Sequence, residues 1–145
     1  MKTRIYLFTG FLDSGKTTFI NDTITSTDFC EGEKSLLIVS EQGEVGYNQE
    51  EIETLNCDIV YVTNEDQWTY EYFEDLRNKY NPTQVLIELN GMFNVNRLLA
   101  CSLPDGWEVV QVLTTINAQT FSLYIQNMRS LLFQHVVHTD LLIFN

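Results

Sequence analysis

The chain has 145 residues, of which 44% are hydrophobic and 12% aromatic, and its 20 acidic and 8 basic side chains give a net charge of −12. The apolar content excludes a disordered chain, and the length favours one domain with one core. With so few Lys and Arg residues the chain has no broad basic surface, so we expect neither nucleic acid nor a membrane as a partner. Three cysteines without a close pair favour reduced thiols and a cytoplasmic location.

Six short apolar runs recur along the chain, and continuous runs of this kind are typical of parallel strands that are buried on both faces. They are Ile5–Phe8, Leu36–Val39, Ile59–Val62, Val85–Leu89, Val109–Leu113 and Leu141–Phe144. Segments with helical spacing lie between them, among them Trp68–Tyr80 and Phe121–Leu132. This alternation predicts an α/β fold with a doubly wound, mostly parallel sheet and helices on both faces, in three layers.

A phosphate-binding motif directly follows the first predicted strand. The residues from Gly10 to Thr17 fit the pattern G-x-x-x-x-G-K-[ST], in which glycines let backbone N–H groups surround phosphates at the start of a helix. Lysine then reaches the β- and γ-phosphates, and the hydroxyl after it ligates Mg²⁺. The predicted nucleotide ligands are Gly10, Asp13, Ser14, Gly15, Lys16, Thr17 and Thr18. The alternative is a glycine-rich turn before an ordinary amphipathic helix.

Carboxylates end two further predicted strands at the same edge of the sheet. Glu88 closes an otherwise apolar run, and an unpaired carboxylate there would cost several kcal/mol of desolvation unless a cation or a hydrogen-bond donor meets it. The alternative is that Glu88 is simply solvated at the sheet edge. Glu41 and Glu44 follow the second strand, next to Gly43 and Gly46 as possible hinges, which predicts either a mobile switch or a solvated acidic loop.

Four segments carry a resemblance to a known family. The phosphate loop reads G-F-L-x-S-G-K-T-T, residues 40–46 read S-E-Q-G-E-V-G, and residues 85–91 read V-L-I-E-L-N-G. These resemble the loop, the N-E-F-G-E-[IV]-G segment and the E-x-x-G element of CobW-like GTPases, relatives of the UreG and HypB metallochaperones. Residues 140–145 resemble the strand that leads into N-K-x-D, which reads guanine.

The resemblance implies a P-loop NTPase fold and a Mg²⁺-dependent GTPase that assists insertion of a metal or cofactor into a client protein. It implies GTP rather than ATP as the nucleotide, Thr17 and Glu88 at the Mg²⁺ ion, and Gly91 beside the γ-phosphate. The implied catalytic residues are Lys16, Glu41 and Glu44. Asn145 would begin the guanine-reading motif.

One family element is missing. Metal-carrying members have C-x-C-C after the third strand, where this chain reads Thr63-Asn64-Glu65-Asp66-Gln67, so a transition-metal site is doubtful. The lone Cys57 is expected to be a small buried hydrophobe. His135 and His138 share a predicted helix face without a third ligand, which favours a surface role over a metal site.

The end of the chain lacks the lysine and aspartate of N-K-x-D. We therefore expect residues 1–145 to be the N-terminal part of a nucleotide-binding domain in a longer protein. The sequence leaves a homodimer open.

Two other functions compete with the GTPase. Residues 28–78 hold 14 of the 20 acidic side chains and 2 of the 8 basic ones, which would suit a nucleotide-gated adaptor that docks a basic partner. A small-molecule kinase that uses ATP ranks last, because no arginine cluster is evident for the transferred phosphoryl group.

Overall fold

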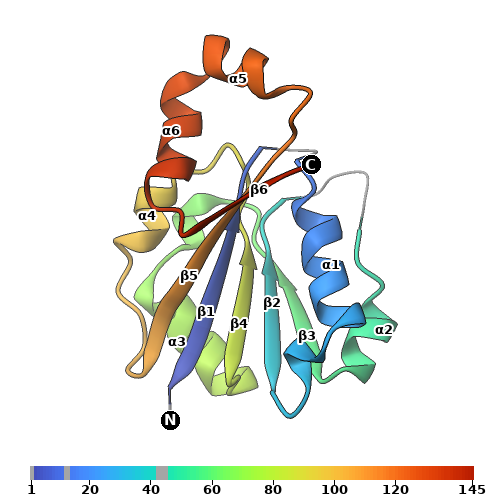
Figure 1. Cartoon of the computed structure of the whole chain (residues 1–145). Coiled ribbons are helices and arrows are strands. Elements are labelled where there is room, and N and C mark those ends of the chain that lie inside the picture. The colour runs from blue at the N-terminus through green and yellow to red at the C-terminus, as the bar shows by residue number, and fades with distance from the viewer. Residues whose placement is uncertain (1, 12–13, 42–45) are drawn as a thin grey trace.

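The computed structural model describes residues 2–11, 14–41 and 46–145, and its centre is a six-stranded sheet (Figure 1). The strand order is β3-β2-β4-β1-β5-β6, and every neighbouring pair is parallel. The strands are β1 (Thr3–Thr9), β2 (Ser35–Val39), β3 (Cys57–Tyr61), β4 (Gln84–Glu88), β5 (Trp107–Ile116) and β6 (Leu141–Phe144). All six predicted strands are confirmed, and β2 and β4 are buried along their whole length, as their continuous apolar runs require.

The helices form layers on both faces of the sheet. They are α1 (Lys16–Ser26), α2 (Gln49–Thr54), α3 (Tyr70–Tyr80), α4 (Val95–Leu99), α5 (Phe121–Asn127) and α6 (Arg129–Val137), with short 3₁₀ turns at Asp28–Cys30 and Glu65–Gln67. Ile20 of α1 and Ile52 of α2 pack in one apolar cluster, whereas Phe73 of α3 and Val95 of α4 pack in a second. The two clusters lie on opposite faces of the strands, so the predicted three-layer α/β fold is confirmed.

The predicted helix at Trp68–Tyr80 begins two residues later than expected. The Thr69 hydroxyl accepts a hydrogen bond from the Tyr72 N–H and caps α3. Trp68 precedes this cap and stacks on Phe73 at a centroid distance of 5.8 Å. The position of Trp68 in the apolar pattern therefore reflects its packing in the core and does not make it part of α3.

The predicted helix at Phe121–Leu132 is two helices. Met128 leaves helical geometry, with φ −135° and ψ 40°, and separates α5 from α6. None of the residues of α5 is buried, whereas α6 buries Leu132 and His135. The apolar spacing thus continues across two separate helices, and of these only α6 packs residues into the protein interior.

The topology brings the carboxyl ends of β1, β4 and β2 side by side. Strand β4 pairs with β1 on one side and with β2 on the other, so residues that follow these three strands meet at one edge of the sheet. In open α/β sheets ligands bind at such an edge. Within the described residues no helix is long and apolar enough to cross a membrane.

Candidate nucleotide site

The phosphate loop joins β1 to α1 at this edge. Gly15, the residue before α1, has φ +95°, and a Cβ there would lie 2.1 Å from the Asn145 side-chain nitrogen. Only glycine fits such a position. The first amide N–H groups of an α-helix have no intrahelical partner, so α1 presents donors and the positive end of its dipole at the loop.

Lys16, the first residue of α1, folds back over the loop. Its Nζ donates hydrogen bonds to the carbonyl oxygens of Gly10 at 2.5 Å and Phe11 at 2.9 Å. It also forms an ion pair of 2.5 Å with the Glu41 carboxylate, and the side chains of Lys16 and Glu41 are only 2% and 8% exposed. The predicted phosphate-binding lysine is therefore held in place by a carboxylate from the loop after β2.

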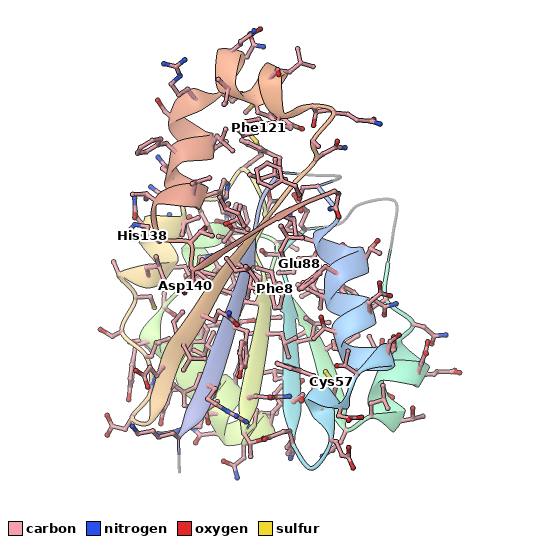
Figure 2. All side chains as sticks on the ribbon, in the orientation of Figure 1. Phe8, Cys57, Glu88, Phe121, His138 and Asp140 are labelled. Carbon is pink, nitrogen blue, oxygen red and sulfur yellow. The ribbon has the colours of Figure 1, made fainter. Side chains whose placement is uncertain are left out.

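Glu88 lies at the carboxyl end of β4 beside the start of α1 (Figure 2). The Thr17 hydroxyl donates to its Oε1 at 2.5 Å, and the Tyr47 hydroxyl donates to its Oε2 at 2.6 Å. Glu88 is 1% exposed, and burial raises the pKa of its carboxyl, against the opposing effect of these two hydrogen bonds and of Lys16. The alternative of a solvated Glu88 is wrong, because hydrogen-bond donors surround the carboxylate inside the protein.

The ends of β2 and β4 are tied together by Ser40. Its hydroxyl donates to the Glu88 carbonyl at 2.8 Å and accepts from the Asn90 N–H at 2.8 Å. One residue on, the Gly91 N–H donates to Glu41 Oε1 at 3.2 Å. The Glu41 carboxylate therefore bridges the Lys16 ammonium and the Gly91 N–H, two groups that the sequence predicts at the phosphates.

Gly91 lies against the phosphate loop at a distance that admits no side chain. A Cβ on Gly91 would lie 2.6 Å from the Gly10 carbonyl oxygen and 2.7 Å from the Phe11 Cα. Both are backbone atoms, so neither can move aside as a flexible side chain could. The close approach explains why this position needs glycine.

Asn145 lies beside the phosphate loop, although 131 residues separate it from Ser14. Its side-chain N–H donates to the Ser14 carbonyl, and the Ser14 hydroxyl lies 2.6 Å from the Thr115 hydroxyl. The strand that carries the predicted guanine-reading residue is thus connected to the loop that is predicted to hold the phosphates.

The structure therefore brings most of the predicted site residues together. Those at the loop or in contact with it are Gly10, Ser14, Gly15, Lys16, Thr17, Glu41, Glu88, Gly91 and Asn145. Thr18 lies in the first turn of α1 and its side chain is exposed. Asp13 and Glu44 lie outside the described residues, so their predicted roles are untested.

Two residues of the site were missed at the sequence level. Tyr47 was not considered because an aromatic residue after an acidic loop carries no motif, yet its hydroxyl is held 2.6 Å from Glu88. Burial and the adjacent Glu88 raise the pKa of Tyr47, which keeps the phenol protonated and able to donate. Ser40 stands where the family segment begins with asparagine, and a small hydroxyl directly after a strand is a common partner of neighbouring backbone groups.

The chemistry of the donor set fits Mg²⁺. Thr17 and Glu88 offer a hydroxyl and a carboxylate oxygen side by side, and hard oxygen ligands beside phosphates are what Mg²⁺ prefers. A cation would also offset the desolvation of the buried carboxylate. Thr17 and Glu88 are therefore the residues that could hold the ion.

Cys57, His135 and His138 are not among the predicted nucleotide ligands. Cys57 begins β3, at the opposite end of the sheet from Glu88 (Figure 2), and its burial in an apolar cluster confirms the packing role expected for it. The expected surface role is wrong for His135, which is fully buried, and holds for His138, which is exposed. Over residues 2–11, 14–41 and 46–145, no three His, Cys, Asp or Glu side chains could jointly hold a metal ion.

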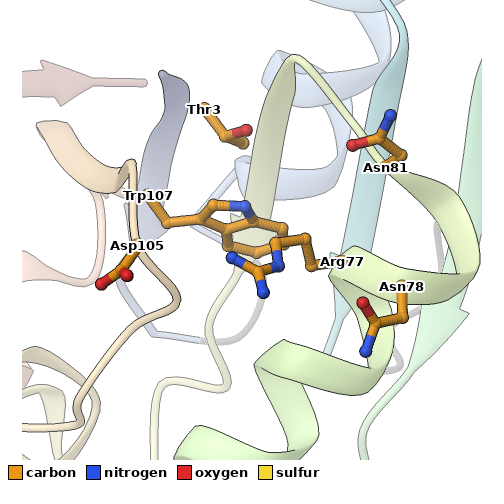
Figure 3. Close-up of a pocket in the computed structure, with 6 residues that line it drawn as sticks. All are labelled: Thr3, Arg77, Asn78, Asn81, Asp105 and Trp107. Carbon is orange, nitrogen blue, oxygen red and sulfur yellow. The ribbon is translucent and has the colours of Figure 1, made fainter. Parts of the chain in front are cut away.

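A hollow at the other end of the strands lacks these groups (Figure 3). It is lined by Thr3, Arg77, Asn78, Asn81, Asp105 and Trp107. Arg77 is paired there with Glu74 of the same helix. The hollow has neither the glycine-rich loop nor the buried carboxylate of the candidate site.

A comparison with known protein families agrees with this geometry. None of the curated protein sequences matches the chain. A family model described as "CobW/HypB/UreG, nucleotide-binding domain" matches residues 4–145, which include all of the six strands except the first residue of β1, and the whole phosphate loop. The chain belongs to the CobW/HypB/UreG family of P-loop nucleotide-binding domains.

Proposed function

We propose that this chain binds GTP with Mg²⁺, hydrolyses it, and uses its nucleotide state to assist insertion of a metal or cofactor into a client protein. The observation that carries the proposal is the bridge that Glu41 makes between the Lys16 ammonium and the Gly91 N–H. A carboxylate at this position offers negative charge and acceptor oxygens, as a terminal phosphate does. GTP is preferred to ATP in the proposal because of the family and of Asn145 beside the phosphate loop.

The residues at the sheet edge have separate roles in phosphoryl transfer. Lys16 and the first amides of α1 neutralise and orient the phosphates, and Gly91 donates its N–H to the terminal one. Mg²⁺, held by Thr17 and Glu88, would neutralise further charge on the phosphate oxygens. The phosphate displaces Glu41, and Glu41 then remains near enough to orient the attacking water, a role for which Glu44 is a second candidate.

The change of partner at Glu41 gives the proposed switch. In this structure Glu41 connects the loop after β2 to Lys16 and Gly91. With GTP bound, that loop is released from both groups, so its position reports the nucleotide state. A client protein that contacts the loop could respond to this difference.

Titration of the protein with fluorescent GTP and ATP in the presence of Mg²⁺ tests the proposal. We expect tighter binding of GTP, loss of binding in Lys16→Ala, and wild-type binding in Lys34→Ala, which removes an exposed lysine of the same charge. Equal or tighter binding of ATP would contradict the guanine preference. Single-turnover hydrolysis equal in wild type and Lys16→Ala, with GTP binding intact in the wild type, would instead support a nucleotide-gated adaptor.

A further inference from the structure

His135 is a buried polar residue that no motif explains. It is 0% exposed, and its Nε2 lies 2.7 Å from the carbonyl oxygen of Gly91. A carbonyl oxygen can only accept, so Nε2 carries the proton in this contact. The bond joins α6 to a glycine that lies 44 residues earlier, beside the phosphate loop.

The other ring nitrogen is left without a partner. Nδ1 of His135 is buried and, among the described residues, has no hydrogen bond. Burial lowers the pKa of His135, so the ring is neutral and Nδ1 is an unpaired acceptor. An orphaned buried acceptor is costly, and an apolar side chain would avoid that cost. The bond to Gly91 is therefore the feature that a histidine adds here.

Gly91 is held on both sides. Its carbonyl oxygen accepts from His135, its N–H donates to Glu41, and its Cα leaves no space for a Cβ against Gly10 and Phe11. The His135 ring also meets the Phe11 ring edge-on, with centroids 5.6 Å apart. His135 thus contacts both the phosphate loop and the glycine that faces it.

We propose that His135 is a positioning residue for the terminal phosphate: by holding the Gly91 carbonyl, it fixes the backbone of Gly91, so that the Gly91 N–H stays directed at the position that the Glu41 carboxylate takes in this structure. The proposal rests on the proposed function, because the terminal phosphate must take that position. It assigns His135 no contact with the nucleotide. Its effect is confined to nucleotides that have a γ-phosphate.

Affinities for GDP and for a non-hydrolysable GTP analogue test this assignment. His135→Met and His135→Leu fill the space without a donor, and His135→Gln places an N–H at a similar reach. We expect both apolar variants to bind the analogue about fivefold to tenfold more weakly, with GDP affinity within about twofold of wild type. His135→Gln should restore most of the affinity for the analogue. His138→Leu is the matched control, since this exposed histidine bonds the Asn96 side chain instead.

Nuclear magnetic resonance of the His135 ring gives a second readout that needs no variant. We expect the Nε2-protonated tautomer in the free protein, and a change in its signals with the GTP analogue that GDP does not produce. If the variants weakened GDP and analogue binding equally, the ratio of the two affinities would be unchanged, and this inference would be overturned while the proposed function stood. Identical ring signals with both nucleotides would have the same consequence. A wild-type protein that binds neither nucleotide would overturn the proposed function and this inference with it.

Discussion

The Lys16 ammonium and the Glu41 carboxylate lie 2.5 Å apart at the carboxyl edge of the sheet, and both side chains are buried. Lys16 is also bonded to two loop carbonyls, and Glu41 to the Gly91 N–H. Removing one partner of a buried ion pair leaves an uncompensated charge, which is strongly unfavourable. A nucleotide can break this pair at low cost only if its phosphates replace the carboxylate.

Glu41→Gln is expected to destabilise the nucleotide-free protein and to tighten its binding of GTP. The amide still accepts from Gly91 but cannot neutralise Lys16, so we expect a loss of roughly 3 kcal/mol in the free energy of unfolding. Phosphates restore the lost charge pairing, so the affinity for Mg²⁺–GTP should rise about tenfold. Thermal unfolding with and without nucleotide measures both effects.

The control for this variant is Glu31→Gln, which removes an exposed carboxylate of the same acidic stretch. It should change neither stability nor affinity. If Glu41→Gln bound GTP more weakly than wild type, Glu41 would be a ligand of the nucleotide complex and not a competitor of the phosphate.

The strands and the phosphate loop could be predicted because their signals are local. Each strand is one continuous apolar run, and the loop is one unbroken motif, so neither depends on knowing what packs against it. The break at Met128 could not be predicted in this way. Its apolar neighbours keep helical spacing across the break, and only the packing of α6 against the rest of the protein separates them.

The site residues that could be predicted are those that belong to sequence motifs. Lys16, Thr17 and Glu88 lie at one edge of the sheet because parallel strands align their carboxyl ends, and their roles at a nucleotide stay predictions. Tyr47 and His135 were not found, since their contacts with Glu88 and Gly91 cross 41 and 44 residues and depend on tertiary packing. A histidine on a short helix has no sequence signal that separates a buried hydrogen-bonding role from a surface one.

Glu88→Gln is expected to stabilise the nucleotide-free protein at neutral pH. Burial raises the pKa of Glu88, so the folded state binds this proton more tightly than the unfolded state does. Stability is therefore lost as the pH rises from the ordinary value of 4.5 through the raised one. The glutamine avoids this loss, and at pH 7 its unfolding midpoint should be about 2–4 °C higher.

The pH dependence distinguishes this cause from a packing effect. Below pH 4.5 wild type and Glu88→Gln should be equally stable, and Glu108→Gln is the control, because it removes an exposed carboxylate. The same Glu88→Gln variant should lose the extra stabilisation that Mg²⁺ gives with GTP. A difference between variant and wild type that is the same at pH 4 and pH 7 would argue against the titration of Glu88.

Gly91→Ala is expected to destabilise the protein and to weaken nucleotide binding. Its Cβ would press on backbone atoms of Gly10 and Phe11, so the phosphate loop or the Gly91 segment must shift, at a cost of about 1–3 kcal/mol. Gly46→Ala is the control, because a Cβ there meets nothing within 4 Å. Denaturant unfolding of both variants measures the difference. Equal stability of Gly91→Ala and wild type would show that this contact is not tight in solution.

The three thiols are expected to react in the order of their exposure and to bind no zinc stoichiometrically. Cys101 is half-buried, whereas Cys30 and Cys57 are buried, and burial raises the pKa of Cys57 to about 12. Native protein at pH 8 should therefore label quickly only at Cys101, and Cys101→Ser should remove the fast phase. Denaturant should expose the other two thiols. Rapid labelling of Cys57, or one zinc ion per chain after purification without chelators, would instead indicate that a thiolate site replaces the missing C-x-C-C cluster.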